Sequence, residues 1–382
     1  MSPLHVGVDA NNVLHDRRGI GRYARALLQR WLQTPPSQLR VSLLVPHLFP
    51  RLVARDLARR IGVESVNAYR RSDATRIGLD VLWYPWSGMT WFAPISSVAT
   101  VHDVWPFASP AHDPRKRHNE QTPFYATAAR AAAIITDSYF SKSEIVRYLQ
   151  VPDEKISVVH LGVDVPAAWT DRGPVLDGAA RYVLFVGEAE ERKDLQTLTR
   201  ALARLDDPLR MTTGLVIVGK SAPSQRRIGG VRHGNPPVLH FETHDSVNTI
   251  VTGEIRDDLL GQLYAGAAAL VFPSTYEGFG LPVLEAMARG VPVVASNAAS
   301  IPEVGGDAAL YFPAGDEGAL AAALQLVLSD TKLAAQLSAA GRARAAQMSW
   351  DQCAQETLAQ LRAAALRGVT RRVRRGQSDP SP

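Results

Sequence analysis

Short apolar runs alternate with longer amphipathic stretches along the whole chain. In the first half, runs rich in Val, Ile and Leu predict strands at 4–9, 40–46, 80–84, 97–103, 132–137 and 156–161. The stretches between them are mostly long enough to form helices. Alternation of strands and helices is typical of a parallel sheet covered by helices on both faces.

A second series of apolar runs follows an interruption. Residues 166–180, PAAWTDRGPVLDGAA, break the pattern with Pro, Gly and charge, which predicts a linker. Beyond it, strands are predicted at 181–187, 213–219, 238–242, 248–252, 268–272, 291–295 and 308–312. The pattern therefore predicts an α/β protein with two doubly wound domains, residues 1–165 and 181–349.

The last residues of the chain carry helical patterns and then a basic segment. Helices are predicted near 316–329 and 331–347, and another begins at Trp350. We expect Gly368 to end this helix, so that 350–368 forms a helix returning to the first domain. Residues 369–382 are expected to be a basic disordered tail.

Composition and charge limit the classes of protein. Among 382 residues, 46% are hydrophobic and 21% charged, which excludes a disordered or fibrous chain. The net charge of +5 comes from 42 basic and 37 acidic residues. Residues 1–170 contain 20 basic and 14 acidic residues, and residues 171–360 contain 16 basic and 22 acidic residues. Residues 361–382 contain 6 basic residues and 1 acidic residue. The two halves therefore have opposite net charges of +6 and −6, and the end of the chain carries a further +5.

The sequence favours a cytoplasmic protein. Its single cysteine, Cys353, cannot form an internal disulfide, which favours a reducing compartment. The start of the chain lacks the pattern of a secretory signal, and no apolar run approaches the roughly 18 residues of a membrane span. We expect a soluble protein or one bound peripherally to the cytoplasmic face of the membrane.

The most informative motif is STYEGFGLPVLEAMARGVPVVAS, residues 274–296. A predicted strand leads into a Gly-rich loop, and Pro282 stands where proline is favoured, in the first turn of a helix. Backbone N–H groups at such a helix start favour a diphosphate. The carboxylates of Glu277 and Glu285 could bind sugar and ribose hydroxyls. The alternative is an ordinary strand-to-helix turn with one capping and one solvated glutamate.

With this motif the chain resembles the retaining glycosyltransferases of family 4. Their GT-B fold has two facing Rossmann-like domains with a cleft between them, and paired glutamates seven residues apart around G-F-G-x-P are their most specific signature. The resemblance also covers GIGRY (19–23), HDVWPF (102–107), ITDSYFSKSEI (135–145), VVHLGVD (158–164), FVGEAEERKDLQTL (185–198) and TGEIRDDLLGQLYAGAAALVFPS (252–274). Within this family, the chain resembles bacterial polysaccharide mannosyltransferases.

A basic pair follows the first predicted strand of the second domain. Arg192 and Lys193 would arrive at the carboxyl edge of that sheet, where they could clamp two phosphates and neutralise a leaving nucleotide diphosphate. The alternative is a solvated surface pair. The same loop contains three acids, which must point away or be paired: Glu188, Glu190 and Glu191. Asp194 stands where asparagine is common in the family.

The resemblance implies two sets of site residues. The catalytic set is His102, Asp103, Arg192, Lys193 and Glu277, with Asp103 supporting His102 near the reaction centre. The donor-binding set is Gly19, Gly21, Gly187, Glu254, Ile255, Gly278, Phe279, Gly280, Leu281 and Glu285. The alternative for His102 is a purely structural role. The alternative for Gly19 and Gly21 is a helix start that needs unusual backbone angles.

The acceptor side has weaker signals. Trp86 and Trp91, in LWYPWSGMTW, could hold a saccharide or lipid-linked acceptor, although burial in the first domain explains them equally well. Arg115 and Lys116 could meet acceptor phosphate or belong to a solvated loop. The basic half and tail could also dock on an anionic inner membrane.

Two motifs that suggest other nucleotide sites are rejected. GIGRYA, residues 19–24, resembles a dinucleotide fingerprint but follows its strand only after a loop. GLVIVGKS, residues 214–221, fits a phosphate-binding loop, yet its middle residues predict a buried strand.

Together these features predict a retaining hexosyltransferase that uses a nucleotide diphosphate sugar, with GDP-mannose as the expected donor in cell-surface polysaccharide synthesis. No cofactor or metal is expected, because the basic pair can neutralise the diphosphate and no Asp-x-Asp motif occurs. A nucleotide-sugar epimerase or a phosphorylase of the same fold is the alternative. A nucleic-acid-binding protein has no motif in its favour, and no nucleic-acid partner is expected.

Overall fold

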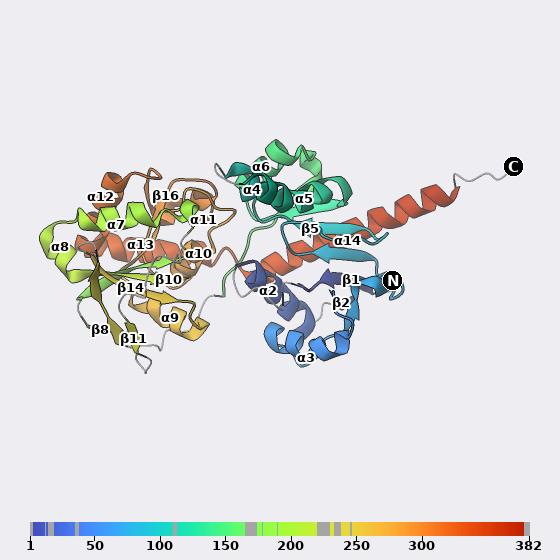
Figure 1. Cartoon of the computed structure of the whole chain (residues 1–382), viewed down its shortest axis with the longest axis horizontal. Helices are drawn as coiled ribbons and strands as arrows, with labels where there is room; N and C mark the ends of the chain where they lie inside the picture. The colour runs from blue at the N-terminus through green and yellow to red at the C-terminus, as the bar shows by residue number, and fades with distance from the viewer. Residues whose placement is uncertain are drawn as a thin grey trace. The chain divides into compact units, whose positions relative to one another are not determined.

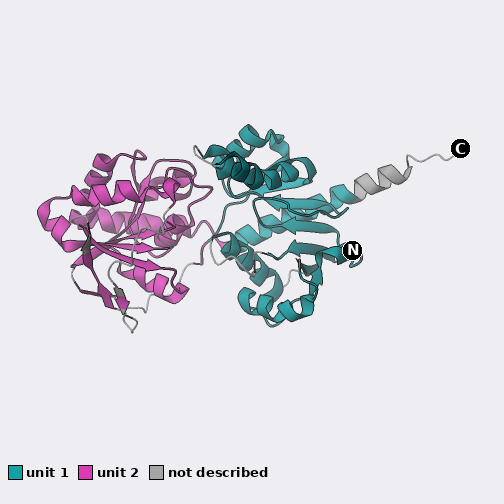
Figure 2. Cartoon of the chain, viewed as in Figure 1, with its two compact units in different colours: residues 1–162, 350–382 teal, residues 163–349 magenta. Residues whose placement is uncertain are grey.

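The computed structural model describes residues 3–11, 13, 19–34, 38–109, 113–164, 174–177, 179–188, 190–219, 230–232, 238–244 and 247–377. The chain divides into two compact units (Figure 2). Unit 1 comprises residues 1–162 and 350–382, and unit 2 comprises residues 163–349.

Unit 1 is built on a seven-stranded parallel sheet with the order β3-β2-β1-β4-β5-β6-β7. Its strands are β1 (Leu4–Asp9), β2 (Leu39–Val45), β3 (Ala68–Arg70), β4 (Val81–Tyr84), β5 (Ser97–Thr100), β6 (Ala133–Thr136) and β7 (Ile156–Val158). Every residue of β4, β5 and β6 is buried, as expected for strands covered on both faces. All six predicted strands of the first half are present, several with shorter bounds, and only the three-residue β3 was not predicted.

Helices connect these strands (Figure 1). They are α2 (Gly19–Gln33), α3 (Pro50–Ile61), α4 (Trp105–Ala108), α5 (Pro114–Arg130) and α6 (Tyr139–Leu149), with short 3₁₀ turns η1 (Arg71–Asp73) and η2 (Asp153–Lys155). The strand order reverses between β1 and β4, since β2 and β3 extend the sheet on one side and β5 to β7 on the other. Ligands of such sheets bind at the carboxyl ends of the strands beside this reversal.

Unit 2 repeats the design with the order β13-β14-β10-β9-β15-β16-β17. Its strands are β9 (Arg181–Val186), β10 (Thr213–Val218), β13 (Glu242–His244), β14 (Val247–Gly253), β15 (Ala269–Phe272), β16 (Val293–Ser296) and β17 (Leu310–Phe312). All pairs are parallel except β13 with β14 at the edge. The reversal here lies between β9 and β15. Because β10 contains Leu215 to Val218, the phosphate-loop interpretation of residues 214–221 is excluded, as predicted.

The helices of unit 2 are α7 (Leu195–Ala203), α8 (Asp207–Thr212), α9 (Asp257–Gly266), α10 (Leu281–Ala288), α11 (Ile301–Gly305), α12 (Glu317–Ser329) and α13 (Thr331–Ala345). Two 3₁₀ turns complete it, η3 (Glu191–Lys193) and η4 (Gly306–Ala308). The predicted α12 and α13 are both present. They belong to the layer that buries one face of the sheet, where Leu324 packs with Val294 and Leu215.

A small second sheet in unit 2 differs from the prediction. It consists of β11 (Gly230–Arg232), β12 (Val238–His240) and β8 (Val175–Asp177). Residues 238–240 of the predicted strand 238–242 therefore join this sheet, whereas Glu242 begins β13 of the main sheet. β8 lies inside the segment 166–180, so the linker prediction is wrong there: Val175 and Leu176 pair with β12. Residues 166–173 and 178 of that segment lie outside the described residues.

The last helix, α14 (Trp350–Gln377), belongs to unit 1. It packs against α2 and beside the central strands β4, β5 and β6. Arg30 Nε bonds Asp351 Oδ1 at 2.6 Å, and Trp31 Nε1 donates to the Ala354 carbonyl at 3.3 Å. Unit 1 is therefore completed by the end of the chain, and the free Cys353 is buried in this contact layer.

The prediction that Gly368 ends this helix is wrong, since α14 continues to Gln377 and residues 369–377 are helical, not a disordered tail. Glycine inside a helix costs only about 1 kcal/mol relative to alanine. A Cβ on Gly368 would lie 2.9 Å from Ser96 Cβ, and Ser96 Oγ donates to the Ala364 carbonyl at 2.7 Å. The glycine thus allows a close approach of α14 to the residue before β5. Residues 378–382 lie outside the described residues.

We expect Leu361→Ala to lower the free energy of unfolding of unit 1 by about 2–5 kcal/mol, because Leu361 is fully buried on α14 and its truncation leaves a cavity. Urea unfolding followed by tryptophan fluorescence measures this. Six of the seven tryptophans lie in unit 1, so the signal reports on it.

Leu366→Ala is the matched control for this experiment. Leu366 is 69% exposed on the same helix, and its truncation should change the same free energy by no more than about 0.5 kcal/mol. Equal effects of the two substitutions would contradict the packing of α14 described above.

Candidate active site

Two loops of unit 2 emerge side by side at the carboxyl edge of its sheet. β9 and β15 are parallel neighbours, with Val183 opposite Ala269 and Leu184 opposite Leu270. The loop after β9 carries the basic pair, and the loop after β15 carries the Gly-rich motif. Because the strand order reverses between these two strands, both loops lie where a ligand of this fold is expected.

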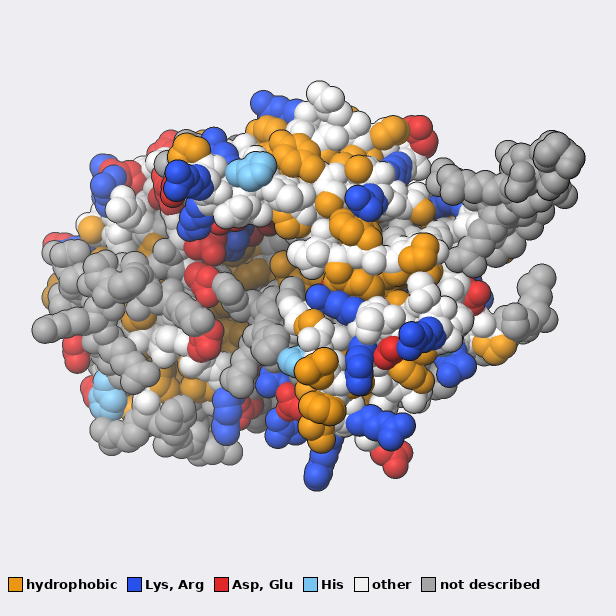
Figure 3. All heavy atoms as spheres, turned by 45° about the vertical axis from the view of Figure 1, so that its right-hand side comes forward, with side chains coloured by type: hydrophobic (Ala, Val, Ile, Leu, Met, Phe, Trp, Pro, Cys, Tyr) orange, Lys and Arg blue, Asp and Glu red, His pale blue; other side chains and the backbone are white. Residues whose placement is uncertain are grey.

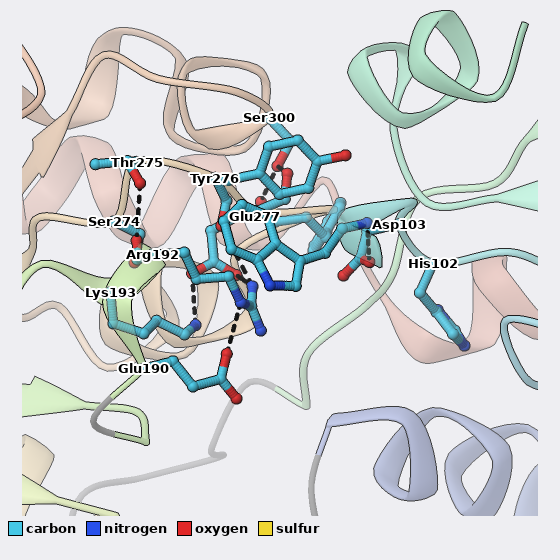
Figure 4. A network of polar contacts seen from close by, with 12 residues as sticks. His102, Asp103, Glu190, Arg192, Lys193, Ser274, Thr275, Tyr276, Glu277 and Ser300 are labelled. Carbon is cyan, nitrogen blue, oxygen red and sulfur yellow. Dashed lines mark hydrogen bonds and ion pairs between the residues drawn. The ribbon is translucent and has the colours of Figure 1, made fainter. Parts of the chain in front are cut away.

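Glu277 joins the two loops by ion pairs (Figure 4). Lys193 Nζ lies 2.5 Å from Glu277 Oε1, and Arg192 Nη1 lies 3.2 Å from Glu277 Oε2. All three side chains are largely buried, with exposed fractions of 9% for Glu277, 11% for Lys193 and 17% for Arg192. The sequence placed these residues in one site, and the structure brings them together as a carboxylate with two cations.

Backbone contacts hold the two loops in this arrangement. The Thr275 amide donates to the Arg192 carbonyl at 2.7 Å. Ser300 Oγ lies 2.9 Å from the carbonyl oxygen of Glu277 and 2.8 Å from that of Phe279, so its one proton is shared between these two acceptors. The side chains of the site are therefore fixed by the backbone on which they stand, as preorganised electrostatic sites require.

Burial would by itself raise the pKa of Glu277, but Lys193 and Arg192 hold that pKa below its usual value. Glu277 is thus an anion at neutral pH, and its stabilising effect is present above the ordinary pKa of a glutamate and is lost as the pH falls through the lowered one. Lys193 Nζ also lies 5.2 Å from the centre of the Phe272 ring, a favourable cation–π distance.

The acidic residues near the basic pair are placed differently from one another. Glu190 Oε2 accepts from Arg192 Nε at 2.7 Å, and its side chain is 39% exposed. Glu191 is exposed, whereas Glu188 is half-buried. Two cations and two carboxylates therefore balance in the structure, and Glu190 is the carboxylate on the solvent side.

The Gly-rich loop ends at a helix, as predicted. Gly280 is the N-cap of α10 with φ +113°, a backbone conformation that favours glycine, and Pro282 stands in the first turn. Gly278, Phe279 and Leu281 surround this helix start, and all but the half-buried Leu281 are buried.

Glu285 is placed one turn inside α10 and is buried. Tyr264 Oη donates to Glu285 Oε2 at 3.0 Å, which holds the carboxylate in one orientation. The predicted role of Glu285 toward a ribose stays a prediction.

The other predicted donor residues lie at the same edge of the unit 2 sheet. Gly187 directly follows β9, and its amide donates to the Val218 carbonyl at 2.9 Å. Glu254, exposed, and Ile255, half-buried, follow β14, which is two strands from β9. Asp194 has a positive φ of +45° and caps α7 at the Thr197 amide, which explains an Asn or Asp at this position.

In unit 1, His102 is buried and bonded to Asp137 and not to Asp103. His102 Nδ1 lies 2.6 Å from Asp137 Oδ2, and Nε2 lies 3.3 Å from the Pro85 carbonyl oxygen. Asp103 instead accepts from the Trp105 amide at 3.0 Å, so the support that it gives to His102 in this structure comes from its charge and not from a hydrogen bond. Both neighbours of the imidazole are acceptors, which favours protonation of both ring nitrogens.

Sequence reasoning missed Asp137, although a signal exists. β5 and β6 pair in parallel with Thr100 opposite Ile135, so His102 and Asp137 are each two residues beyond this pair. Burial lowers the pKa of His102, but the Asp137 charge and hydrogen bond raise it above its usual value overall. Asp137 itself has one oxygen, Oδ1, without a hydrogen-bond partner in the part of the chain described.

A second cluster in unit 1 lies where the strand order reverses. Asp9, at the end of β1, accepts from Arg71 Nη2 at 2.9 Å and from Trp86 Nε1 at 3.3 Å. The Arg71 guanidinium lies 5.2 Å from the centre of the Trp91 ring. Asp9 and Arg71 were not predicted, although Asp9 ends the first apolar strand. Trp86 is buried and Trp91 half-buried, so neither presents a fully open face.

The remaining predicted residues of unit 1 are not joined to these clusters. Arg115 and Lys116 are exposed in the first turn of α5, and Lys116 Nζ lies 4.0 Å from Glu120 Oε1. Gly19 begins α2, and Gly21 is buried within its first turn.

Two comparisons now give the family. Residues 17–166 match the family described as "Glycosyltransferase Family 4", and residues 171–344 match "Glycosyl transferases group 1". The O-antigen chain mannosyltransferase B of Escherichia coli is 33% identical over 276 residues, which make up 69% of this chain and 69% of that protein. The chain belongs to glycosyltransferase family 4.

Solved structures show the fold of this glycosyltransferase. Sucrose-phosphate synthase from Thermosynechococcus elongatus matches with a TM-score of 0.68 and 17% identity, over 95% of this chain and 99% of that chain. Anabaena HepE in complex with UDP and glucose matches with a TM-score of 0.66 and 15% identity, over 94% and 100%. The predicted GT-B fold is confirmed. At these identities the likeness extends to the fold alone.

Two kinds of feature are absent from the described ranges of this glycosyltransferase. No group of three His, Cys, Asp or Glu side chains gathers in a way that could hold a metal ion. No described helix has the length and apolar character of a membrane span.

We expect Asp137→Asn to lower the pKa of His102, because the substitution removes the charge that opposes the effect of burial. The titration of His102 can be followed by NMR, with its resonance assigned by its loss in His102→Gln. The raised pKa also stabilises unit 1 at pH values below about 6.5, and this effect is lost as the pH rises through the raised pKa.

Asp103→Asn is the control for this substitution. Asp103 also raises the pKa of His102, but it acts through charge alone and is the weaker cause, so the decrease should be smaller. An unchanged His102 titration in Asp137→Asn would show that the 2.6 Å contact does not govern its protonation.

Proposed function

We propose that this glycosyltransferase moves a hexosyl group from a nucleotide diphosphate sugar to a saccharide or lipid-linked saccharide, with retention of the anomeric configuration. The observation that carries the proposal is the buried contact of Arg192 and Lys193 with Glu277, beside the start of α10. Two oriented cations next to a helix start suit a diphosphate, which carries negative charge on both phosphates.

Donor binding would change the partners of the basic pair. Glu190 holds Arg192 from the solvent side, so an entering diphosphate competes with this carboxylate for the guanidinium. Glu277 is buried beneath both cations and would keep them in place while they neutralise the charge that develops on the leaving diphosphate. The donor site would therefore need no metal ion.

Mannose is the proposed sugar and GDP the proposed carrier. The mannosyl assignment is supported by the name of the Escherichia coli relative, an O-antigen chain mannosyltransferase that matches over 69% of both chains. The O-antigen in this relative's name also supports a role in cell-surface polysaccharide synthesis, which we place at the cytoplasmic face of the membrane as part of the proposal. The HepE structure contains UDP, so UDP is the base to compare with GDP in binding experiments.

The acceptor is proposed to bind unit 1 at the reversal of its strand order. Asp9 supplies a carboxylate for sugar hydroxyls, and Trp86 and Trp91 supply apolar ring surface next to it. His102, fixed by Asp137 on the neighbouring strand, supplies a positive charge at the same edge. Retention would follow from attack on the donor face that the phosphate leaves, with that phosphate accepting the proton of the acceptor hydroxyl.

Lys193→Ala and Glu277→Ala are each expected to lower the rate of mannosyl transfer from GDP-mannose at least about a hundredfold, as removal of a preorganised charge contact does. Circular dichroism establishes that the variants are folded. Glu277→Ala should also be less stable, because it leaves the buried Lys193 without its counter-ion.

Lys332→Ala and Glu317→Ala are the matched controls in unit 2, since Lys332 is exposed and Glu317 pairs with arginines of α7 and the residue after it, away from the loops of the site. Both should transfer at the wild-type rate. Near-normal turnover of Lys193→Ala would remove Lys193 from the donor site, and product formation without any acceptor would favour an epimerase instead.

Transfer activity is expected to survive EDTA, because Arg192, Lys193 and the helix start supply the positive charge that Mg²⁺ supplies elsewhere. The measurement is the initial rate with and without the chelator at a fixed GDP-mannose concentration. Complete loss that added Mg²⁺ restores would overturn the metal-free proposal without affecting the assignment of the family.

A further inference from the structure

Three large apolar side chains lie exposed within five residues of unit 1. Leu48 is 71% exposed, Phe49 66% and Leu52 77%. They occupy the end of the loop after β2 and the first turn of α3, where the Leu52 amide donates to the Phe49 carbonyl at 3.0 Å. Elsewhere in the described ranges, no two exposed large apolar residues lie within five positions of each other. We call these three residues the apolar patch.

The apolar patch is not required for packing of its own helix. The face that α3 turns to the core consists of Leu57, Ala58 and Ile61. Single exposed leucines are common on protein surfaces, but adjacent ones rimmed by polar residues mark an interaction surface.

Basic side chains accompany the patch on the same helix. Arg51 and Arg55 are exposed, and no ion pair of either is found with the described residues. The one acid of α3, Asp56, is already bonded by Arg59 and Arg60. Figure 3 shows this interleaving of hydrophobic and basic side chains on the face that includes α3.

Unit 1 as a whole is positively charged, like the arginines beside the apolar patch. Residues 1–162 and 350–382 contain 26 basic and 16 acidic residues, a net charge of +10, whereas unit 2 contains 16 and 21, a net charge of −5. Apolar side chains among arginines on a cationic unit match the surface of an anionic bilayer, which offers headgroup charge and an acyl interior together.

The patch also lies on the edge of the sheet where the acceptor is proposed to bind. β2 and β1 are parallel neighbours, with Asp9 opposite Leu44. The loop that carries Leu48 therefore leaves the sheet one strand from Asp9, and neighbouring strands are about 4.8 Å apart. A membrane held there would present a lipid-linked substrate to this edge.

We propose that the apolar patch, with Arg51 and Arg55, docks this enzyme on an anionic lipid bilayer. The proposal rests on the proposed function, because it supplies the route by which a lipid-linked acceptor reaches unit 1. The patch inserts its apolar side chains between the lipids, and the two arginines contact the headgroups.

Co-sedimentation with vesicles tests this proposal. The full-length protein is measured on vesicles of phosphatidylglycerol and phosphatidylcholine, and on phosphatidylcholine alone. We expect the triple variant Leu48→Ser, Phe49→Ser, Leu52→Ser to bind the anionic vesicles at least about tenfold more weakly than the wild type. Arg51→Glu with Arg55→Glu should weaken this binding by a similar factor, and added salt should weaken wild-type binding.

Matched controls stand in unit 2. Met211→Ser with Leu326→Ser removes exposed apolar side chains, and Arg200→Glu with Arg204→Glu makes the same change in net charge as the α3 variant. Both should bind within about twofold of the wild type. Equal weakening by these controls, or undiminished binding of the patch variants, would overturn the proposal.

Deletion of residues 369–382 distinguishes the patch from the basic end of α14. If this deletion abolishes vesicle binding while the patch variants bind normally, the membrane contact lies at the C-terminus and the proposal fails. It also fails if light scattering shows a wild-type dimer that the triple variant dissociates, because the patch is then covered by a second copy.

Two further measurements separate this proposal from the proposed function. Thermal stabilisation by GDP and transfer from GDP-mannose to a soluble saccharide should be unchanged in the patch variants, which lie outside the proposed donor and acceptor residues. Patch-dependent vesicle binding by a protein that transfers no sugar would leave the docking surface valid and refute the function. Sugar transfer by a protein whose vesicle binding does not depend on the patch would refute the docking surface and leave the proposed function valid.

Discussion

The buried ion pairs of Glu277 are the interaction on which the proposed donor site depends. A carboxylate that is 9% exposed would be unfavourable as an anion, and two cations removed from water would be unfavourable without it. Each charge therefore requires the others, and they come from loops after neighbouring strands. The contact ties the two loops together where the strand order reverses, so the stability of the site and the placement of its two cations have one origin.

Unit 1 uses the same construction with different chemistry. His102 and Asp137 follow neighbouring parallel strands, and their 2.6 Å contact is buried. Asp9 likewise lies beside Trp86 because β1 and β4 are neighbours. In each case the register of a parallel pair places two side chains at one edge of the sheet, and burial strengthens the contact between them.

This dependence on register explains what the sequence could predict. Apolar runs identify the strands of both main sheets, and the glutamate motif locates the loop after β15, because these signals are local. The partners of His102 and Asp9 are not local: Asp137 and Arg71 become neighbours only through the strand order. The prediction that Gly368 ends the last helix was wrong for a related reason, because the residue that Gly368 contacts, Ser96, is far away in the sequence. β8 was missed because three residues give too short a pattern to distinguish from a linker.

The division of charge acquires a structural basis once α14 is assigned to unit 1. The helix brings six arginines of the final segment to the unit that already carries the basic half of the chain, which gives +10 against −5. The proposed diphosphate site in unit 2 does not depend on a uniform field, because two buried cations with their own counter-ion act over a few ångströms, where the net charge of the domain matters little. A surface that attracts an extended anionic layer has the opposite requirement, because screening limits each charge to about 8–10 Å and many must act together. If both proposals hold, an acidic unit with a basic site and a basic unit with exposed arginines are two different solutions to binding negative charge.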